Sequence, residues 1–184
     1  MTRSSQVIYQ IGWKTMDNPM GKLFVVAAWV LLGGAFSASG AFAQSANDVV
    51  GTWTLVSSIT ELDGKKTDQF GPGAKGMMSL DAGGRFMLTI IGADLPKFAS
   101  NNRATGTLEE NKAVVSKSIA LFGTYSINLA DKTLTLKIET ATFPNWNATE
   151  QKRSLITVSG DELKYATARA SGGGTATVTW KRAK

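Results

Sequence analysis

The chain of 184 residues offers few side chains for chemistry, because it contains neither histidine nor cysteine. A serine–histidine triad, a thiol nucleophile, a His/Cys zinc site and a disulfide are therefore excluded. Any catalysis would have to use a carboxylate, Tyr, Lys or Arg. Glu139 and Glu150 lie on adjacent predicted strands, with Tyr125 on a neighbouring one. A carboxylate whose pKa is raised in an apolar interior could act as the general base of an isomerisation or cyclisation.

Paired charges on solvent-exposed faces are the usual explanation of such residues, so we expect a binding protein with no catalytic residue, metal or cofactor. Apolar side chains on predicted strands, together with polar and aromatic groups on loops, are the candidates for ligand contact. They are Met78, Phe86, Leu88, Phe98, Arg103, Phe122, Tyr125, Asn145 and Trp146. Thioethers and aromatic rings at a barrel mouth suit an apolar ligand.

Each of these groups also has a purely structural explanation. Met78, Phe86 and Leu88 could simply fill a core. The segment Phe143-Pro144-Asn145-Trp146 is a turn by composition, and its two aromatic residues could equally rim a pocket. Phe98 and Arg103 could form a lid and a carboxylate partner, or belong to a solvated loop.

The basic residues are scattered along the chain, although its formal net charge is +6. They occur singly or in pairs such as Lys65-Lys66, Lys152-Arg153 and Lys181-Arg182. A nucleic-acid surface usually shows a clustered basic stripe interleaved with aromatic residues. We therefore interpret these charges as solvated surface groups and expect no nucleic-acid partner.

Residues 1–43 have the layout of an N-terminal extension followed by a cleaved secretory signal peptide. Lys22 precedes an apolar run over residues 23–36, and Ala41-Phe42-Ala43 fits an Ala-x-Ala cleavage site. The run is shorter than the roughly 20 residues of a spanning helix, so only an uncleaved leader would attach the chain to a membrane. Translation is expected to begin at Met20, and residues 44–184 to fold in the periplasm or outside the cell.

The elements that would position the candidate residues are predominantly strands rich in β-branched residues. They are predicted at residues 49–61, 75–80, 85–91, 119–129, 133–142, 150–158, 162–168 and 175–182. In the first, Trp53, Leu55, Ser57 and Ile59 should share one face. Thr107 and Glu110 form a capping-box pattern, which predicts one helix up to about Ser118.

Eight successive strands joined by short turns predict an all-β fold, an antiparallel up-and-down barrel with room for one small ligand. An open sheet or sandwich with a filled core is the alternative.

Four short segments give the mature chain a resemblance to the bacterial lipocalin-like domain family. They are Gly51-Thr52-Trp53, Phe122-Gly123-Thr124-Tyr125, Phe143-Pro144-Asn145-Trp146 and Thr177-Val178-Thr179-Trp180-Lys181-Arg182. The resemblance implies a calycin-type barrel in which Gly51 and Trp53 close one end and Arg182 packs over the tryptophan. The chain lacks the Thr-Asp-x-x-Tyr motif of the animal secreted lipocalins.

The function expected from these features is that of a periplasmic or secreted protein, a monomer or weak dimer. It would hold a small hydrophobic molecule inside the barrel, oriented by a polar group such as Arg103 or Asn145. Two alternatives remain: a cofactor-independent isomerase or cyclase using Glu and Tyr, and an envelope structural protein with a filled core.

Overall fold

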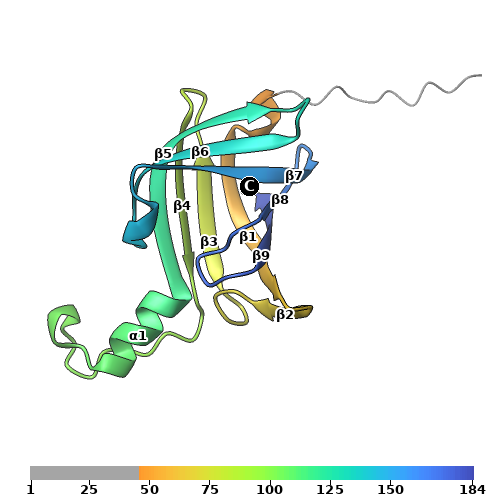
Figure 1. Ribbon diagram of the computed structural model, residues 1–184. Coiled ribbons are helices and arrows are strands. Elements are labelled where there is room, and N and C mark those ends of the chain that lie inside the picture. Colours follow the sequence, from red (N-terminus) through yellow and green to blue (C-terminus); the bar gives the residue numbers. More distant parts are fainter. Residues whose placement is uncertain (1–45) are drawn as a thin grey trace, which may run out of the picture. The chain divides into compact units, whose positions relative to one another are not determined.

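Strands make up most of the computed structural model, which describes residues 46–184 (Figure 1). The strands are β1 (Gly51–Leu62), β2 (Lys65–Asp68), β3 (Lys75–Leu80), β4 (Arg85–Ile91), β5 (Ser118–Asn128), β6 (Thr133–Ala141), β7 (Thr149–Val158), β8 (Glu162–Thr167) and β9 (Thr175–Arg182). The helix α1 (Leu108–Lys117) and three 3₁₀ turns, η1 (Ala46–Val49), η2 (Arg103–Thr105) and η3 (Pro144–Trp146), complete the elements. The predicted signal peptide, its cleavage site and the start at Met20 lie outside the described residues.

The predicted eight-stranded antiparallel barrel is confirmed. Neighbouring strands pair in the order β1-β3-β4-β5-β6-β7-β8-β9, and β1 also pairs with β9, which closes the sheet on itself. The short strand β2, which the sequence pattern did not predict, pairs with the far end of β1. Closure leaves no long unpaired edge on the barrel wall.

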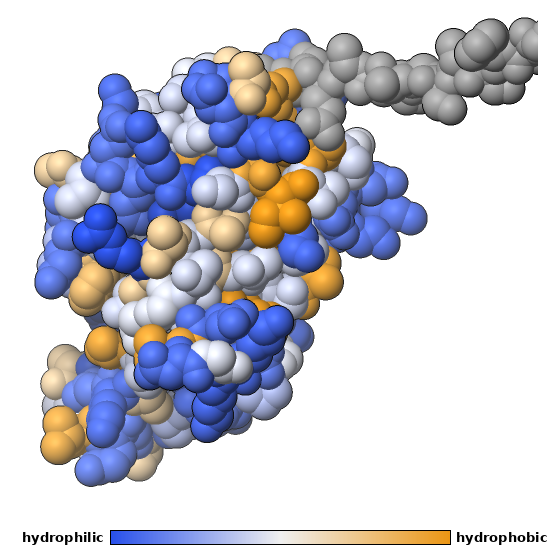
Figure 2. All heavy atoms as spheres, turned by 45° about the vertical axis from the view of Figure 1, so that its right-hand side comes forward, coloured by the Kyte–Doolittle hydropathy of each residue, from blue (hydrophilic) through white to orange (hydrophobic). Residues whose placement is uncertain are grey.

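One face of each barrel strand packs into a common core. Leu134, Leu136 and Ile138 of β6 alternate with more exposed residues, and the same period places Met78 and Leu80 of β3 inside. Apolar residues at period two fit this arrangement because successive side chains of a strand point to opposite faces. On the side seen in Figure 2, hydrophobic residues form small separate groups among hydrophilic ones.

Bulges interrupt the alternation of two strands, and in β1 the predicted facing is wrong. Val56 is an extra residue in β1 opposite β9 and is 60% exposed, so Ser58 rather than Ser57 follows Leu55 into the interior. The prediction that Ser57 and Ile59 share the face of Trp53 is therefore wrong. A bulge of the same kind places Ile156 of β7 outside. One inserted residue reverses the alternation that follows it.

One end of the barrel is plugged by the residues that the family resemblance picked out. The guanidinium carbon of Arg182 lies 4.3 Å from the centroid of the Trp53 ring, and Trp53 is fully buried. Arg182 Nη1 donates to the Val50 carbonyl at 2.8 Å, and Nη2 and Nε donate to the carbonyls of Asp48 and Gly160. A Cβ on Gly51, whose φ is +139°, would lie 2.5 Å from Arg182 Nη1. Glycine is thus required beneath the guanidinium.

The single α-helix predicted from the capping box is present. Thr107 accepts a hydrogen bond from the Glu110 amide, and the Glu110 carboxylate accepts one from the Thr107 amide. The helix contains no buried residue and extends away from the barrel wall beyond the ends of β4 and β5 (Figure 1). No helix among residues 46–184 is long and apolar enough to cross a membrane.

Candidate ligand-binding site

The end of the barrel opposite the Arg182 plug carries a hollow, which we call the mouth. Its volume is about 380 Å³. It lies among the loop that follows β2, the C-terminal turn of α1, the end of β6 and the β8–β9 loop, and is lined by Gln69, Phe70, Val114, Val115, Ser116, Ser118, Ile119, Thr142, Phe143, Ser171 and Gly172. The mouth lies on connecting segments, which rearrange more easily than strands.

Below the mouth, the barrel interior holds a small cavity of about 40 Å³. Its lining consists mainly of apolar side chains, those on strands coming from β4, β5, β6 and β9, with Gln69, Arg153, Tyr165 and Thr167 as its polar groups. Gln69, Phe70 and Ile119 line both this cavity and the mouth, so the two spaces adjoin. The cavity has room for about three waters, as each needs roughly 10–15 Å³ on this measure.

A buried guanidinium lies at the side of this cavity. Arg153 of β7 is 6% exposed, and its backbone partner across the sheet is the fully buried Leu134. Arg153 Nη2 donates to Gln151 Oε1 at 2.5 Å, and the guanidinium carbon lies 5.9 Å from the centroid of the Trp146 ring. No carboxylate of residues 46–184 is within ion-pair distance of it.

The electrostatics of the cavity follow from this burial. Desolvation lowers the pKa of the Arg153 guanidinium, and the neighbouring Tyr165 acts in the opposite direction. Desolvation raises the pKa of the Tyr165 phenol, while Arg153 and the Trp180 indole oppose that rise. Arginine keeps its charge in proteins, so the cavity contains a cation beside a neutral phenol.

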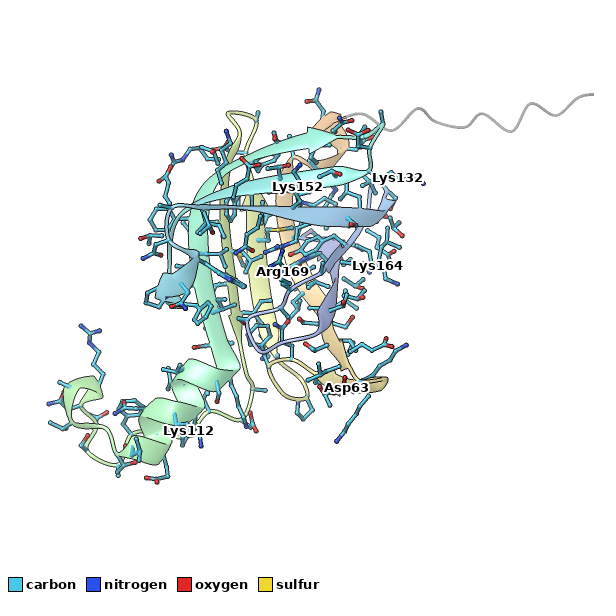
Figure 3. All side chains as sticks on the ribbon, in the orientation of Figure 1. Asp63, Lys112, Lys132, Lys152, Lys164 and Arg169 are labelled. Carbon is cyan, nitrogen blue, oxygen red and sulfur yellow. The ribbon has the colours of Figure 1, made fainter. Side chains whose placement is uncertain are left out.

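A groove in the barrel wall leads to the same guanidinium. Strands β7 and β8 pair only from Ser154 and Ala166 onward, and the first part of β7 diverges from the end of β8. The groove has a volume of about 440 Å³ and is lined by Trp146, Thr149, Glu150, Gln151, Lys152, Arg153, Thr167, Ala168 and Arg169. Lys152 and Arg169, labelled in Figure 3, lie on its two sides. Trp146, Arg153 and Thr167 are common to the groove and the cavity.

Two of the predicted ligand-contact residues, Leu88 and Trp146, line the cavity. Met78 and Phe86 are buried nearer the plug, where Met78 pairs with Trp53. Tyr125 is also at the plugged end, since its hydroxyl donates to the Asp81 carbonyl at 2.7 Å in the β3–β4 turn. Desolvation, and then the Asp81 carboxylate, raise the pKa of this phenol.

The other predicted contacts lie away from the cavity. Phe122 is 39% exposed on the outer face, where it lines a shallow groove with Met87 and Thr140. Phe98 packs against Gly106 within the excursion that carries α1, and Arg103 is exposed in η2 of the same excursion. Asn145 is exposed in η3. These residues are not brought together into one site.

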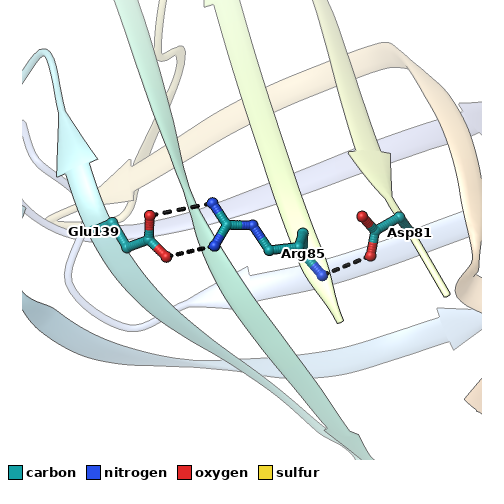
Figure 4. Close-up of polar contacts among 3 residues, drawn as sticks. All are labelled: Asp81, Arg85 and Glu139. Carbon is teal, nitrogen blue, oxygen red and sulfur yellow. Dashed lines mark hydrogen bonds and ion pairs between the residues drawn. The ribbon is translucent and has the colours of Figure 1, made fainter. Parts of the chain in front are cut away.

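The carboxylates considered for catalysis face outward. Arg85 Nη1 and Nη2 donate to the two Glu139 oxygens at 2.8 and 3.2 Å on the barrel surface (Figure 4). Glu150 is exposed, with an oxygen 4.0 Å from Lys137 Nζ. No Asp or Glu from residue 47 onward is buried, and no cluster in the described chain has the His, Cys, Asp or Glu groups to hold a metal. Neither Glu139 nor Glu150 points into the barrel interior, as the proposed acid–base site would require.

Among the cavity residues that sequence reasoning missed, Arg153 is the charged one; it was missed because the pair Lys152-Arg153 was interpreted as solvated. That interpretation is correct for Lys152 and wrong for Arg153. If β7 alternated regularly, Lys152 would share a face with Ile156 and Val158, and that face would be predicted to be the apolar one. The bulge at Ile156 instead places Arg153, Leu155 and Val158 inside. The available signal was that Arg153 shares its face with Leu155.

The lipocalin-like domain family matches residues 50–183, the whole barrel from β1 to the end of β9. The chain belongs to the lipocalin-like domain family. Among solved structures, this lipocalin-like domain is similar to a redesigned β-barrel, with 18% identity, a TM-score of 0.41 and coverage of 76% of this chain and 95% of that one. It is also similar to a de novo designed fluorescence-activating β-barrel, with 12% identity, a TM-score of 0.40 and coverage of 75% and 96%. No curated protein matches the chain.

Proposed function

We propose that this lipocalin-like domain binds a small, mostly hydrophobic molecule that enters the barrel through the mouth. The supporting observation is that the mouth adjoins the apolar interior cavity, because Gln69, Phe70 and Ile119 line both spaces. The mouth alone is within the range of about 300–1,000 Å³ that small-molecule sites occupy. From the predicted leader we further propose that the protein works in the periplasm or outside the cell.

Entry of a ligand requires the interior space to grow. Side chains bordering the cavity at this end lie on connecting segments: Phe70 follows β2, Trp146 lies in η3 and Ala170 lies in the β8–β9 loop. Their outward movement would join the cavity to the mouth without unpairing any barrel strand. The ligand would then contact Leu88, Leu121 and Leu136 from the inside.

A second candidate is a structural protein of the cell envelope whose interior is core. The volume of about 40 Å³ favours it, because so small a cavity holds waters but no drug-sized molecule. The two candidates differ in whether the interior opens.

Substitution of Ala176 distinguishes them. Ala176 is 2% exposed and lines the cavity at the start of β9, whereas its neighbour Thr175 is exposed. The purified protein should yield a bound small molecule on extraction and native mass spectrometry, and should bind a hydrophobic fluorescent probe. Ala176→Leu should weaken probe binding at least about tenfold, since it fills space the ligand needs, while Thr175→Leu should not. Absence of any extracted molecule and of probe binding would favour the structural candidate.

A further inference from the structure

The buried guanidinium of Arg153 has no counter-charge within the described chain, although its surroundings are apolar. Its hydrogen bond, from Nη2 to Gln151 Oε1, goes to a neutral amide, and its aromatic neighbour Trp146 is also neutral. A buried charge normally has a charged partner, because removing an ion from water costs several kcal/mol. The folded protein therefore buries a cation that forms no ion pair with the described residues.

Arg153 lies between an apolar space and a basic groove, which suits a ligand with an apolar part and a negatively charged end. On one side Arg153 borders the interior cavity, with Leu136, Leu121 and Val178 in the same lining. On the other side it borders the β7–β8 groove, which also carries Lys152 and Arg169. The apolar part of a ligand would lie in the barrel, and a negatively charged end at the guanidinium.

We propose that Arg153 binds the carboxylate of an amphiphilic ligand, whose hydrocarbon part occupies the barrel, and that Lys152 and Arg169 attract this anion to the groove. The proposal rests on the proposed function and specifies the class of ligand. A carboxylate fits because a guanidinium presents a planar fork of N–H donors that matches its two oxygens. The Tyr165 hydroxyl, at the same cavity, is available as a neutral hydrogen-bond donor to an anion.

The proposal predicts an unusual combination of effects for Arg153→Met. The methionine keeps much of the length and apolar stem of the arginine side chain. It removes the positive charge, which has no charged partner in the unliganded protein. The unliganded variant should therefore resist urea at least as well as the wild-type chain, whereas loss of a structural arginine would lower its resistance. Binding of a carboxylate ligand should be lost at the same time.

The experiment compares decanoate with decan-1-ol, two ligands of equal chain length of which only the first is an anion at neutral pH. Displacement of a hydrophobic fluorescent probe measures both. The wild-type chain should bind decanoate at least about tenfold more tightly than decanol, and Arg153→Met should remove this preference while leaving decanol binding within about twofold. Arg169→Met, at an exposed position of the same groove, should slow decanoate association at low salt without abolishing the preference.

The outcomes separate this proposal from the one on which it rests. If the wild-type chain binds decanol and decanoate equally, or if Arg153→Met keeps the preference, the carboxylate proposal is wrong while hydrophobic binding stands. If neither compound nor the probe binds, the proposed function itself is wrong. If Arg153→Met unfolds in less urea, Arg153 has a structural role, and Arg153→Lys, which keeps the charge without the planar fork, then gives the decision. Loss of the preference by Arg153→Lys, together with normal decanol binding, supports the proposed contact of the fork with the carboxylate. Retention of the full tenfold preference by Arg153→Lys contradicts that contact.

Discussion

Two arginines of the barrel are expected to have opposite effects on stability. Arg182 has backbone carbonyls as hydrogen-bond acceptors and the Trp53 ring beneath it, so each part of the guanidinium has a partner. Arg153 has a single neutral acceptor and is more deeply buried. The first arrangement is expected to favour the folded state and the second to oppose it.

Replacement of Arg182 by lysine should therefore destabilise the protein although the charge is kept. An ammonium cannot form the same set of carbonyl contacts while stacking on Trp53, and the loss is expected to be about 2–3 kcal/mol. Urea unfolding followed by tryptophan fluorescence measures the change. Lys181→Gln, at the exposed neighbouring position, is the matched control and should stay within about 0.5 kcal/mol of wild type.

The Arg85–Glu139 pair should matter much less than its two hydrogen bonds suggest. Both side chains are about half exposed, at 53% and 47%, and solvent screens such a pair. Glu139→Gln is expected to change the free energy of unfolding by less than about 1 kcal/mol. A loss above about 2 kcal/mol in urea unfolding would contradict this, and any loss of ligand binding would revive a role for the carboxylate.

Sequence reasoning succeeded with individual residues where a local pattern determines their environment. Gly51, Trp53 and Arg182 were placed together through the family resemblance, and a close approach leaves glycine as the only residue that fits beneath the guanidinium. Arg153 was missed because the bulge at Ile156, three residues further along β7, takes Val158 out of the alternation that Arg153 and Leu155 follow. A bulge changes the facing of every later residue but has no strong signature in composition.

At the scale of elements, α1 shows what local chemistry alone determines. Its capping box and its start at Leu108 follow from Thr107 and Glu110, and both were predictable. Strand β2 was not predictable, because all four residues of Lys65–Asp68 are exposed and lack an apolar alternation. It forms by pairing with the end of β1, a tertiary contact that no period in its own residues reveals.

The stability of α1 should depend on pH through Glu110. The Ala99 and Thr107 amides donate to its carboxylate, each at 2.8 Å, and these bonds lower the pKa of Glu110 from its ordinary value of 4.5. A lowered pKa in the folded state stabilises the helix at pH values above 4.5, and this contribution is lost as the pH falls through the lowered pKa.

Hydrogen-exchange protection factors of the α1 amides test this dependence. In the wild-type chain they should fall as the pH drops below 4.5, while those of the β4 and β5 amides stay constant. Glu110→Gln should lower the α1 protection already at neutral pH and remove most of the fall. Glu109→Gln deletes the same charge without the two amide contacts, so it should keep the fall; an identical response of the two variants would assign the effect to charge alone.

At the scale of the whole molecule, the barrel is closed by strand pairing and the α1 excursion is an addition to it. The Gly92 amide donates to the Lys117 carbonyl at 2.7 Å, so the excursion begins and ends at two hydrogen-bonded residues. Its link to the ends of the barrel includes the exposed ion pair of Lys117 and Asp94. The barrel fold was predictable because eight alternating strands with short turns require closure, whereas the interior volume depends on how side chains pack.

Removal of the excursion should separate the fold from the proposed function. Replacing residues 93–116 by Asn-Gly would join β4 and β5 through a two-residue hairpin turn at the Gly92–Lys117 pair. The free energy of unfolding should change by no more than about 2 kcal/mol, because an exposed ion pair is lost and a long loop is shortened. Probe binding should weaken, since Val114, Val115 and Ser116 form one wall of the mouth. A variant that folds cooperatively and binds the probe as tightly as wild type would show that α1 has no part in the site.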